Sequence, residues 1–368
     1  MHNELELAGR TDEIEPPTPA QVKKLLQKWS QELGFQQLDI SDAELREDEK
    51  NLERWLDQGM HADMAYMRSH GTKRTRPEEL VPGTVSVISV RINYLTEPNT
   101  AAARALEQKH LGYISRYALG RDYHKLIRKK LQKLATKLGE LIGPFGYRVF
   151  TDSAPVMERA LARKAGLGWV GKHTNLIERH NGSWFFLGEI YTDLKLPVNK
   201  SQSDNYCGSC TACIDICPTR AIVAPYVVDA RRCISYQTIE NKGSIAPELR
   251  RGIGNRVFGC DDCQLACPWN RYAKLSVERD FNPREKIKNI SLLELFAWTK
   301  DEFEANTEGS AIRRISYEQW QRNIAIAIGN APKKAEYTRA LAARLDSASP
   351  LLKEHLQWAL EEQAEKLG

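Results

Sequence analysis

All eight cysteines of this 368-residue chain lie between Cys207 and Cys267. Two groups stand out: CGSCTACIDICP, which is a C-x2-C-x2-C-x3-C-P pattern, and CDDCQLACP, which is a C-x2-C-x3-C-P pattern. Loops of two residues let successive thiolates converge on one metal cluster, and the proline then turns the chain so that the last thiolate is carried away. This spacing favours iron–sulfur chemistry.

The first cysteine group has the spacing of bacterial two-cluster ferredoxins, in which three cysteines bind one [4Fe–4S] cluster and the fourth binds the other. Exchange of the fourth cysteine between the two groups predicts a testable ligand set that leaves no thiol over. One cluster takes Cys207, Cys210, Cys213 and Cys267, and the other takes Cys217, Cys233, Cys260 and Cys263.

Three alternatives compete with two iron–sulfur clusters. Disulfides are disfavoured, because nothing marks the chain as exported and cytosolic thiols stay reduced. Two all-cysteine zinc sites remain an alternative, although zinc ribbons seldom use the first pattern. A bare two-cluster electron carrier without a reaction of its own is the third. Two clusters close together usually conduct electrons to an acceptor, so we expect a reductase site nearby.

The composition is that of a globular protein, with 42% hydrophobic and 27% charged residues. No apolar run approaches the roughly 18–20 residues that a membrane span needs, so we expect no membrane association. The acidic, proline-containing start of the chain lacks the basic and apolar stretches of an export signal, which predicts a disordered lead-in (1–18) and a cytoplasmic protein. The net charge of +5 does not identify a partner.

Basic residues gather between Arg116 and Lys137, where Asp122 is the one acidic residue before Lys137. A basic stripe on one helix face is typical of proteins that bind a phosphate backbone. A solvated helix surface would have the same pattern, and the sequence does not separate the two.

Elements alternate along the first two hundred residues. Residues 20–60 have helical spacing, and 84–95 alternate as a strand. A helix with apolar positions from Ile127 to Leu141 follows, then a strand at 147–151. Further predicted elements are a helical segment at 154–164, a strand at 183–194, and helices at 292–298, 317–329 and from 337 onward. The pattern predicts an α+β fold: a mixed α/β domain (19–200), a ferredoxin-like domain (201–285) and a helical C-terminal segment (286–368). Helices near 320–328 and 351–364 are expected to form a solenoid-like pair.

The glycine-rich loop GLGWVGK, from Gly166 to Lys172, contains G-x-G-x-x-G. A dinucleotide fingerprint follows a strand and opens a helix, whereas here a predicted helix precedes and a β-rich stretch follows. We therefore interpret it as a tight loop that lets the backbone approach a bulky ligand, with a purely structural turn as the alternative.

Four long segments, together with the cysteine groups, closely resemble epoxyqueuosine reductases. They are DSAPVMERALARKAGLGWVGKHTNLI (152–177), DARRCISYQTIE (229–240), RYALGRDYHKLIRKKL (116–131) and GTKRTRPEELVPGT (71–84). The resemblance covers nearly the whole chain. It implies an oxidoreductase that uses two [4Fe–4S] clusters and cobalamin to reduce epoxyqueuosine to queuosine at the wobble position of a tRNA anticodon. It also implies a cobalamin-binding first domain and HEAT-like C-terminal helices, which are fewer here than in longer members.

The resemblance assigns the general acid to Asp152, which follows the strand at 147–151. A protonated aspartate near neutral pH requires a pKa well above its usual ~3.9, and hence burial beside an apolar group. By itself Asp152 would also suit a helix N-cap. Candidate cofactor contacts, each with an ordinary structural alternative, are Arg76, Tyr117, Lys172, Asn175, Ser235, Gln237 and Asp261, besides Asp152 itself.

The cobalamin expectation comes from the resemblance alone. Asp122-Tyr-His124 begins like the D-x-H-x-x-G motif of cobalamin mutases, but Ile127 stands where the glycine belongs. The tRNA anticodon stem–loop is the expected partner, with an unidentified low-potential electron donor, and we expect a monomer. Candidate phosphate contacts are Arg116, Arg121, Lys125, Arg128, Lys129, Arg313 and Arg314.

Two other functions remain open from the sequence. A reductive dehalogenase-like enzyme acting on a small molecule would use the same cofactors, but such enzymes usually carry an export signal. The other is a protein without catalytic activity, either an electron carrier or a zinc-bearing nucleic-acid module. Iron content, colour and corrinoid binding would separate the three.

Overall fold

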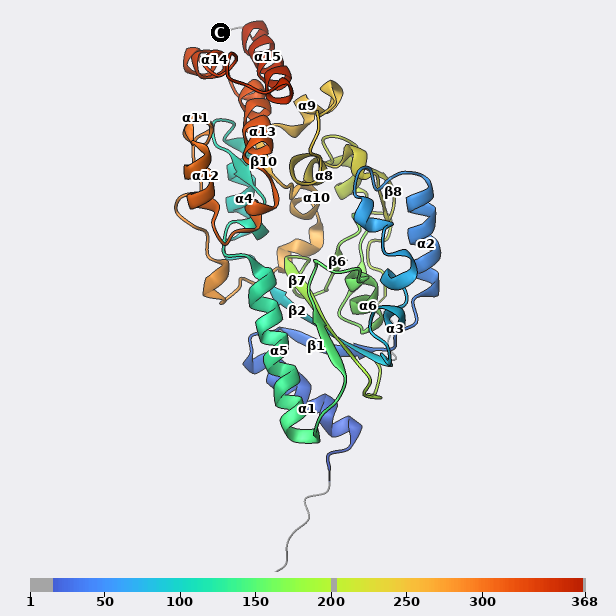
Figure 1. Ribbon diagram of the computed structural model, residues 1–368. Coiled ribbons are helices and arrows are strands. Elements are labelled where there is room, and N and C mark those ends of the chain that lie inside the picture. The colour runs from blue at the N-terminus through green and yellow to red at the C-terminus, as the bar shows by residue number, and fades with distance from the viewer. Residues whose placement is uncertain (1–15, 200–203, 367–368) are drawn as a thin grey trace, which may run out of the picture.

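The computed structural model describes residues 16–199 and 204–366 (Figure 1). Most of the predicted disordered lead-in and the predicted domain boundary at 200 therefore lie outside the described residues. The first part of the chain is built on a four-stranded sheet with the order β1-β2-β7-β4. Its strands are β1 (Gln37–Ser41), β2 (Ser86–Asn93), β7 (Phe185–Thr192) and β4 (Tyr147–Phe150), and each neighbouring pair is antiparallel.

Helices cover both faces of this sheet, so that β2 is buried along its whole length. On one face lie α1 (Pro19–Glu32) and α5 (Tyr123–Ile142), whose Leu26, Ile127 and Leu131 share a core with Ile88 and Val90 of β2. Gly188 of β7 is required there, because a Cβ atom would come within 3.0 Å of the side chains of both Ile127 and Leu131.

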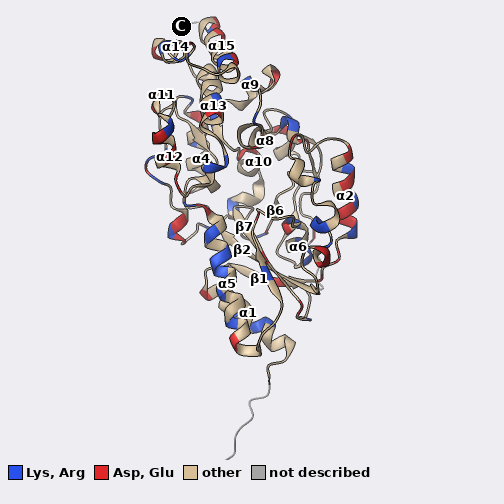
Figure 2. Ribbon diagram, in the orientation of Figure 1, with Lys and Arg blue, Asp and Glu red and all other residues tan. Residues whose placement is uncertain are grey.

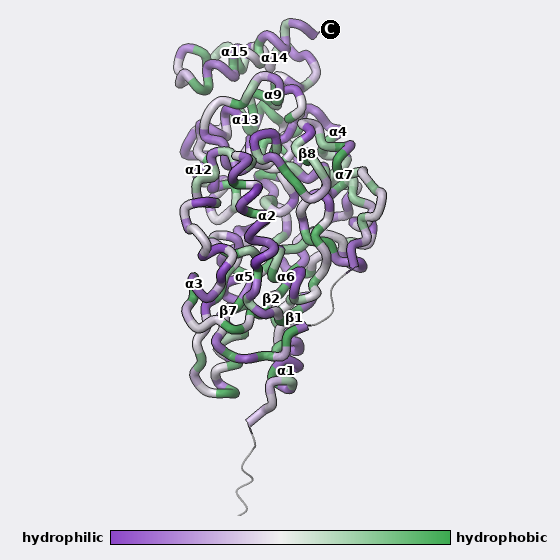
Figure 3. Tube along the Cα trace, turned by 90° about the vertical axis from the view of Figure 1, so that its right-hand side faces the viewer, coloured by the Kyte–Doolittle hydropathy of each residue, from purple (hydrophilic) through white to green (hydrophobic). Residues whose placement is uncertain are grey.

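The opposite face carries α6 (Glu158–Lys164), whose Leu161 packs with Val87 and Tyr191. Near α6 lie α2 (Arg46–Asp57) and α3 (Pro77–Leu80) (Figure 1). Most residues of α2 are hydrophilic, as Figure 3 shows. Side chains of β2 and β7 that point toward α6 include the polar pair Ser89 and Glu189, which stand opposite each other in the sheet.

The structure corrects two expectations about this part. Residues 20–60 are not helical throughout, because β1 separates α1 from α2. This strand is short and lies at the sheet edge, and its alternation of polar and apolar residues is easily mistaken for one face of a helix. Leu141, predicted on the buried face of its helix, is 40% exposed near the helix end.

The cysteine segment folds as short elements between longer ones. They are α7 (Ala212–Asp215), β8 (Ile222–Ala224), β9 (Val227–Val228), α8 (Ile234–Ile239), α9 (Pro247–Ile253), β10 (Arg256–Phe258) and α10 (Asp262–Leu265). Two short strands precede it, β5 (Trp169–Val170) within the glycine-rich loop and β6 (Leu176–Ile177) after it. They pair with each other, and α6 precedes them as predicted.

A segment much earlier in the sequence connects the cysteine segment to the first part of the chain. After α4 (Asn99–Glu107), β3 (Tyr113–Ile114) runs parallel to β10. The Asn255 amide donates to the carbonyl oxygens of Ala105 and Leu111 at 3.1 and 3.0 Å, so α4 and β3 are held against the cysteine-bearing half.

The C-terminal part is helical, with α11 (Leu292–Ala297), α12 (Lys300–Thr307), α13 (Tyr317–Asn330), α14 (Ala335–Ala342) and α15 (Pro350–Glu365). The predicted pair of helices is present as α13 and α15, where Gly329 lets Trp358 approach closely and the Gln363 amide donates to the Ile328 carbonyl at 2.8 Å. Arg322 of α13 is fully buried and donates to the carbonyl oxygens of Gln237 and Asn241, which ties α13 to the cysteine segment. Within the described residues, no helix is long and apolar enough to cross a membrane.

Candidate active site and metal centres

A cavity of about 480 Å³ lies where the sheet, the loop after β4 and the cysteine segment meet. Tyr117, Tyr123, Phe186 and Leu187 belong to the aromatic and aliphatic part of its wall, which contributes most of the lining surface. Such a mostly apolar cleft with a few polar groups is the usual form of a ligand site. The polar groups that converge on it include Asp152 and the thiols of several cysteines.

Asp152 sits at the edge of this cavity in a backbone conformation that few residues adopt, with φ at +56°. Its backbone N–H donates to Oε1 of Glu158 at 2.5 Å, which holds the turn between β4 and α6. The Asp152 side chain is 59% exposed at the cavity, and the surrounding cavity walls still partly desolvate its carboxylate. A strained residue at a cavity is typical of a functional position.

Two neighbours from the start of α5 contact the Asp152 carboxylate. The Tyr123 hydroxyl donates to Oδ2, and His124 Nε2 lies 3.3 Å from the same oxygen. On its other side, His124 Nδ1 lies 2.6 Å from Asp122, which is also the N-cap of α5. A carboxylate on one ring nitrogen orients an imidazole for proton transfer at the other ring nitrogen.

These contacts determine where the proton lies. Although burial disfavours its charged form, the carboxylates of Asp122 and Asp152 raise the pKa of His124 to about 9. The hydrogen bonds from His124 and Tyr123 outweigh the desolvation of Asp152 and hold its pKa below the usual value. At neutral pH, His124 is therefore an imidazolium and Asp152 is ionised. This differs from the expected elevated pKa of Asp152, because the sequence did not reveal a basic neighbour.

A second pair of carboxyl groups lies beneath the Asp152 turn. Glu189 of β7 is fully buried and lies next to Glu158. Burial, reinforced by the charge of Glu158, raises the pKa of Glu189 well above its usual value. Burial and the charge of Asp152 raise the pKa of Glu158 to about 7, although the hydrogen bond from the Asp152 N–H opposes this.

Glu158 makes stability fall as pH rises. Its pKa is higher in the folded protein than in the unfolded chain, so its stabilising contribution is full below the unfolded value of 4.5 and is lost as pH rises toward about 7. Glu158→Gln keeps an oxygen for the Asp152 N–H and cannot ionise. We expect it to raise the free energy of unfolding by ~1–3 kcal/mol at pH 8, with little change at pH 5.

Thermal unfolding of the holoprotein at both pH values measures this effect. Glu140→Gln, at an exposed position on α5, is the matched control and should unfold like the wild type at either pH. Equal pH dependence in Glu158→Gln and the wild type would contradict the assignment.

The eight cysteines fall into two sets around two cavities. A smaller cavity of about 200 Å³ is lined by one set, and the larger cavity is lined by the other. The first set is Cys207, Cys210, Cys213 and Cys267, and the second is Cys217, Cys233, Cys260 and Cys263. These are the two ligand sets that the spacing predicts, including the exchange of Cys217 and Cys267 between the groups.

Besides Asp152, four of the candidate cofactor residues line the larger cavity: Tyr117, Asn175, Ser235 and Asp261. Asp261 is almost fully buried, and its carboxylate accepts from the Ser115 hydroxyl at 2.5 Å and the Tyr113 hydroxyl at 2.7 Å. Burial raises its pKa despite these hydrogen bonds. Tyr117 packs edge-on against Tyr123 and Phe186 and so forms part of the aromatic wall.

Three other candidates have different surroundings. Arg76 lines neither cavity and is paired with Glu49 at 2.8 Å and Glu79 at 3.2 Å. Lys172 lines the smaller cavity, where its ammonium donates to the carbonyl oxygens of Gly208 and Cys210. Gln237 is buried and donates to the Arg231 carbonyl. Arg76, Lys172 and Gln237 do not line the larger cavity, and their contact with a cofactor stays a prediction.

The candidate phosphate contacts are also divided. Arg121, Lys125, Arg128, Lys129 and Arg313 are exposed, and blue bands of Lys and Arg run along α5 in Figure 2. Arg116 is half-buried, with its guanidinium 4.7 Å from the centre of the Tyr113 ring. Arg314 pairs with Glu240 at 3.0 Å. Arg116 is therefore less accessible than the exposed members of this set, and its contact with a phosphate stays a prediction.

Sequence reasoning missed Tyr123, His124, Glu158 and His173 as site residues. The Asp122-Tyr-His124 triplet resembles only the start of a mutase motif, and this comparison does not indicate a proton-transfer role. His173, beside the glycine loop, borders both cavities, and within residues 16–199 and 204–366 its buried Nε2 has no hydrogen-bond partner. Burial lowers the pKa of His173 to about 4, so it is a neutral imidazole. The sequence signal that could have identified His173 as a site residue is its position directly after Gly171 and Lys172, at the end of the glycine-rich loop.

Comparison with known proteins agrees with this arrangement. Residues 74–153 match the family model described as epoxyqueuosine reductase QueG, DUF1730, and residues 206–270 match a 4Fe-4S double cluster binding domain. The chain is 54% identical to an epoxyqueuosine reductase of Pseudomonas aeruginosa, covering 96% of this chain and 98% of the relative. It is 53% identical to that of Escherichia coli, covering 96% and 92%.

Two solved structures have the same fold. Epoxyqueuosine reductase from Bacillus subtilis, solved with its aspartate-bearing catalytic loop swung out of the active site, superposes with a TM-score of 0.83 at 26% identity, covering 94% of this chain and 91% of that one. An epoxyqueuosine reductase solved with an epoxyqueuosine-modified tRNA-Tyr stem loop has a TM-score of 0.82 at 24% identity, covering 94% and 100%.

The fold and the double-cluster segment define an iron–sulfur oxidoreductase. More narrowly, the identity to full-length relatives shows that the chain belongs to the epoxyqueuosine reductase family.

Proposed function

We propose that this protein reduces epoxyqueuosine to queuosine at the wobble position of a tRNA anticodon. The observation that carries the proposal is that Asp152, with His124 3.3 Å behind it, meets four cysteines at one largely apolar cavity. The family membership and the solved relative with a modified tRNA stem loop support it. The reaction removes the epoxide oxygen as water, leaves a carbon–carbon double bond, and consumes two electrons and two protons.

We propose that each cysteine set holds one [4Fe–4S] cluster. The matching double-cluster family model supports this reading. Such clusters supply single electrons at low potential, which amino acid side chains do not. Because the set around Cys263 lines the larger cavity, its cluster would lie next to the bound substrate and cofactor.

We propose that the larger cavity also binds cobalamin. Its residues fit a large, mainly apolar ring with polar edges. Phe186 and Leu187 offer apolar surface, while the unpaired Nε2 of His173 and the side chain of Asn175 offer polar contacts. Tyr117 and Ser235 are further residues that would hold it. When bound, the cobalt centre supplies electrons to the substrate carbon.

The protein's own part is to deliver protons. As the epoxide opens, its oxygen gains negative charge and requires a proton. Asp152, on the cavity edge, is within reach of an incoming ligand, and the imidazolium of His124 lies 3.3 Å behind it. A proton moves from His124 through Asp152 to the oxygen, while Asp122 and the Tyr123 hydroxyl stabilise the remaining charges.

The exposed cations of α5 are the proposed contacts to the RNA backbone. Phosphate contacts release counterions, so affinity falls steeply with salt. We expect the dissociation constant for an anticodon stem–loop to rise by about 100-fold between 50 and 200 mM salt if about four contacts form. The double variant Lys125→Gln/Lys129→Gln should weaken binding and lower the slope of log K against log salt by about 1.5–2.

Fluorescence anisotropy with a labelled stem–loop measures both quantities. Lys50→Gln on α2, which lies on the other side of the molecule from α5 in Figure 1, is the matched control and should keep the wild-type slope. An affinity that hardly changes with salt would exclude this surface.

The activity itself is tested on anaerobically prepared holoprotein. The protein is loaded with iron, sulfide and cobalamin and supplied with a chemical reductant and an epoxyqueuosine-containing anticodon stem–loop. Nucleoside analysis should show queuosine formed in step with epoxyqueuosine lost. Holoprotein with intact clusters that leaves epoxyqueuosine unchanged would overturn the proposal.

A further inference from the structure

The two cysteine sets differ in their access to solvent. Cys210 of the first set is exposed, and the Gly208–Thr211 loop around it is exposed as well. The thiols of the second set share the larger cavity with Asp152, where the substrate is proposed to bind. A protein that delivers electrons from outside therefore meets the loop of Cys210 before it meets the second set.

Three aromatic side chains stand around the smaller cavity beside this loop. Tyr206 and Trp269 line the cavity with ring centres 5.7 Å apart, and Tyr272 follows 6.0 Å from Trp269. Tyr206 and Tyr272 are 39% and 40% exposed, which is high for such large rings. Exposed aromatic residues next to arginine are enriched in protein–protein interfaces.

Two arginines lie on these rings. The guanidinium of Arg179 is 5.3 Å from the centre of the Tyr206 ring, and that of Arg271 is 4.6 Å from the centre of the Tyr272 ring. Both arginines are exposed, so the stacking presents their charge in a fixed place. Asp204 accepts from the Tyr206 hydroxyl at 3.3 Å and reduces this positive charge without cancelling it.

The loop is itself held rigid from below. Lys172 is largely buried, and its ammonium donates to the carbonyl oxygens of Gly208 at 2.7 Å and Cys210 at 2.9 Å. A rigid loop keeps the first cysteine set at a constant depth beneath the surface. Rapid electron transfer needs such a constant short path between donor and acceptor.

We propose that Arg179, Tyr206, Trp269, Arg271 and Tyr272 form the docking surface for the electron donor, a small acidic protein that carries one electron at a time. This rests on the proposed function, since it assumes a cluster on the first cysteine set. Each encounter oxidises the donor by one electron and reduces the protein by one, and two encounters supply the two electrons of one turnover. The arginines steer the acidic partner, and the aromatic rings supply the apolar contact.

The test uses holoprotein without RNA, so that cluster reduction is read apart from turnover. An acidic flavodoxin with its FMN fully reduced is the probe, and bleaching of the clusters' visible absorbance is followed by stopped flow. Arg179→Glu/Arg271→Glu should raise the flavodoxin concentration for half-maximal rate at least tenfold, and added salt should shrink the difference from the wild type. Reduced methyl viologen, which is small and needs no docking surface, should bleach both proteins at rates within twofold.

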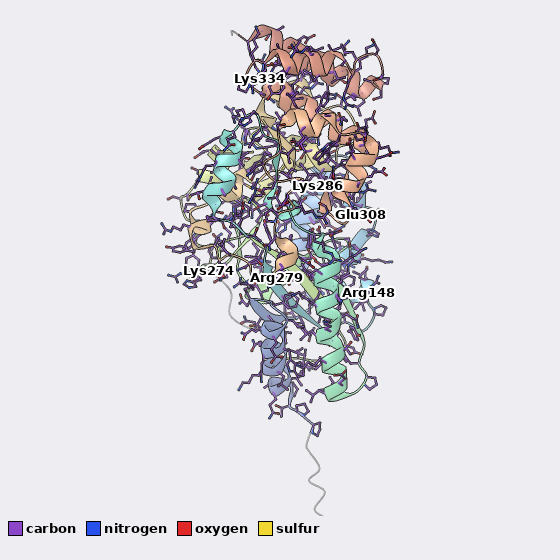
Figure 4. The ribbon with its side chains drawn as sticks, turned by 90° about the vertical axis from the view of Figure 1, so that its left-hand side faces the viewer. Arg148, Lys274, Arg279, Lys286, Glu308 and Lys334 are labelled. Atoms are coloured by element: carbon purple, nitrogen blue, oxygen red, sulfur yellow. The ribbon has the colours of Figure 1, made fainter. Side chains whose placement is uncertain are left out.

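Arg148→Glu is the matched control. Arg148 is also exposed and lies 5.2 Å from the centre of the Phe150 ring, but on β4. Figure 4 shows it on the other side of the molecule from Lys274, which closely follows Arg271. This variant should accept electrons from flavodoxin like the wild type.

Three results would overturn the docking surface. The first is a double variant whose rate of bleaching depends on flavodoxin concentration as in the wild type. The second is an equal rise of the half-maximal flavodoxin concentration in Arg148→Glu. The third is slower bleaching of the double variant by methyl viologen, which would mean that the arginines stabilise the cluster itself. A wild-type protein whose clusters are bleached by methyl viologen and not by flavodoxin would overturn the acidic donor. Failure to form queuosine with normal bleaching would instead count against the proposed function alone.

Discussion

Asp152→Asn should lower kcat for queuosine formation by about 10²–10⁴, the range that general acid catalysis usually contributes. Asparagine has nearly the same size and still offers an oxygen to the Tyr123 hydroxyl, so the turn and its contacts are preserved. It cannot pass a proton from His124 to the opening oxygen. Single-turnover assays on a modified stem–loop, with cluster absorbance and RNA affinity measured in parallel, separate lost chemistry from lost binding.

Asp57→Asn is the control for this variant. Asp57 is a strongly exposed carboxylate on α2 whose partner is Arg68, and its replacement should leave turnover at the wild-type level. Full activity in Asp152→Asn with intact cofactors would remove Asp152 from the mechanism.

The same pair predicts how wild-type turnover depends on pH. His124 has its pKa raised to about 9 by Asp122 and Asp152, so it holds the donated proton below that value and loses it above. The rate of the chemical step should therefore be level near neutrality and fall as pH rises through about 9. A single-turnover rate that stays constant from pH 8 to 10 would show that the proton comes from elsewhere.

The double variant Cys213→Ala/Cys267→Ala should lose about half of the iron, and each single variant should lose the same amount. Cys213 belongs to the first cysteine group and Cys267 to the second, yet both line the smaller cavity and would hold the same cluster. Either single substitution already removes that cluster, so the second substitution causes no further loss of iron. Turnover should be undetectable in all three variants, because electrons no longer reach the larger cavity.

Cys213→Ala/Cys260→Ala is the matched comparison. Cys260 lines the larger cavity, so this double variant removes one ligand from each set and should lose nearly all of the iron. Iron and sulfide analysis of anaerobically purified protein measures the result. If each group held its own cluster without exchange, Cys213→Ala/Cys267→Ala would lose nearly all of the iron instead. Zinc in place of iron would remove the redox proposal altogether.

Local features of the sequence were enough to predict much of the fold. The apolar spacing from Ile127 to Leu138 defines α5, because a helix that covers a sheet must present one apolar face every 3.6 residues. The alternating stretch around Ser86–Asn93 defines β2 in the same way. Packing of the C-terminal helices was also visible in their periodicity. The short edge strand β1 was not, since five residues do not establish a period.

The order and direction of the strands were decided by tertiary structure. Alternation of strands and helices is compatible with a parallel sheet, yet β1, β2, β7 and β4 are antiparallel. Pairing partners are chosen by which apolar faces meet across long stretches of chain, and no local pattern contains that choice. For the same reason the sequence did not reveal that β3 pairs with β10.

At the site, the features that the sequence predicted and those that the tertiary structure decided are clearly different. The spacing of the cysteines within each group is covalent and predicted the two sets, and the folded chain brings each set to one cavity. The surroundings of Asp152 were decided by the tertiary structure alone. His124 approaches from another element, and its imidazolium reverses the pKa shift that burial would cause. Electrostatic effects act through space between groups distant in sequence, so the ion pair of Arg76 with Glu49 and the proton on His124 became visible only when the chain was folded.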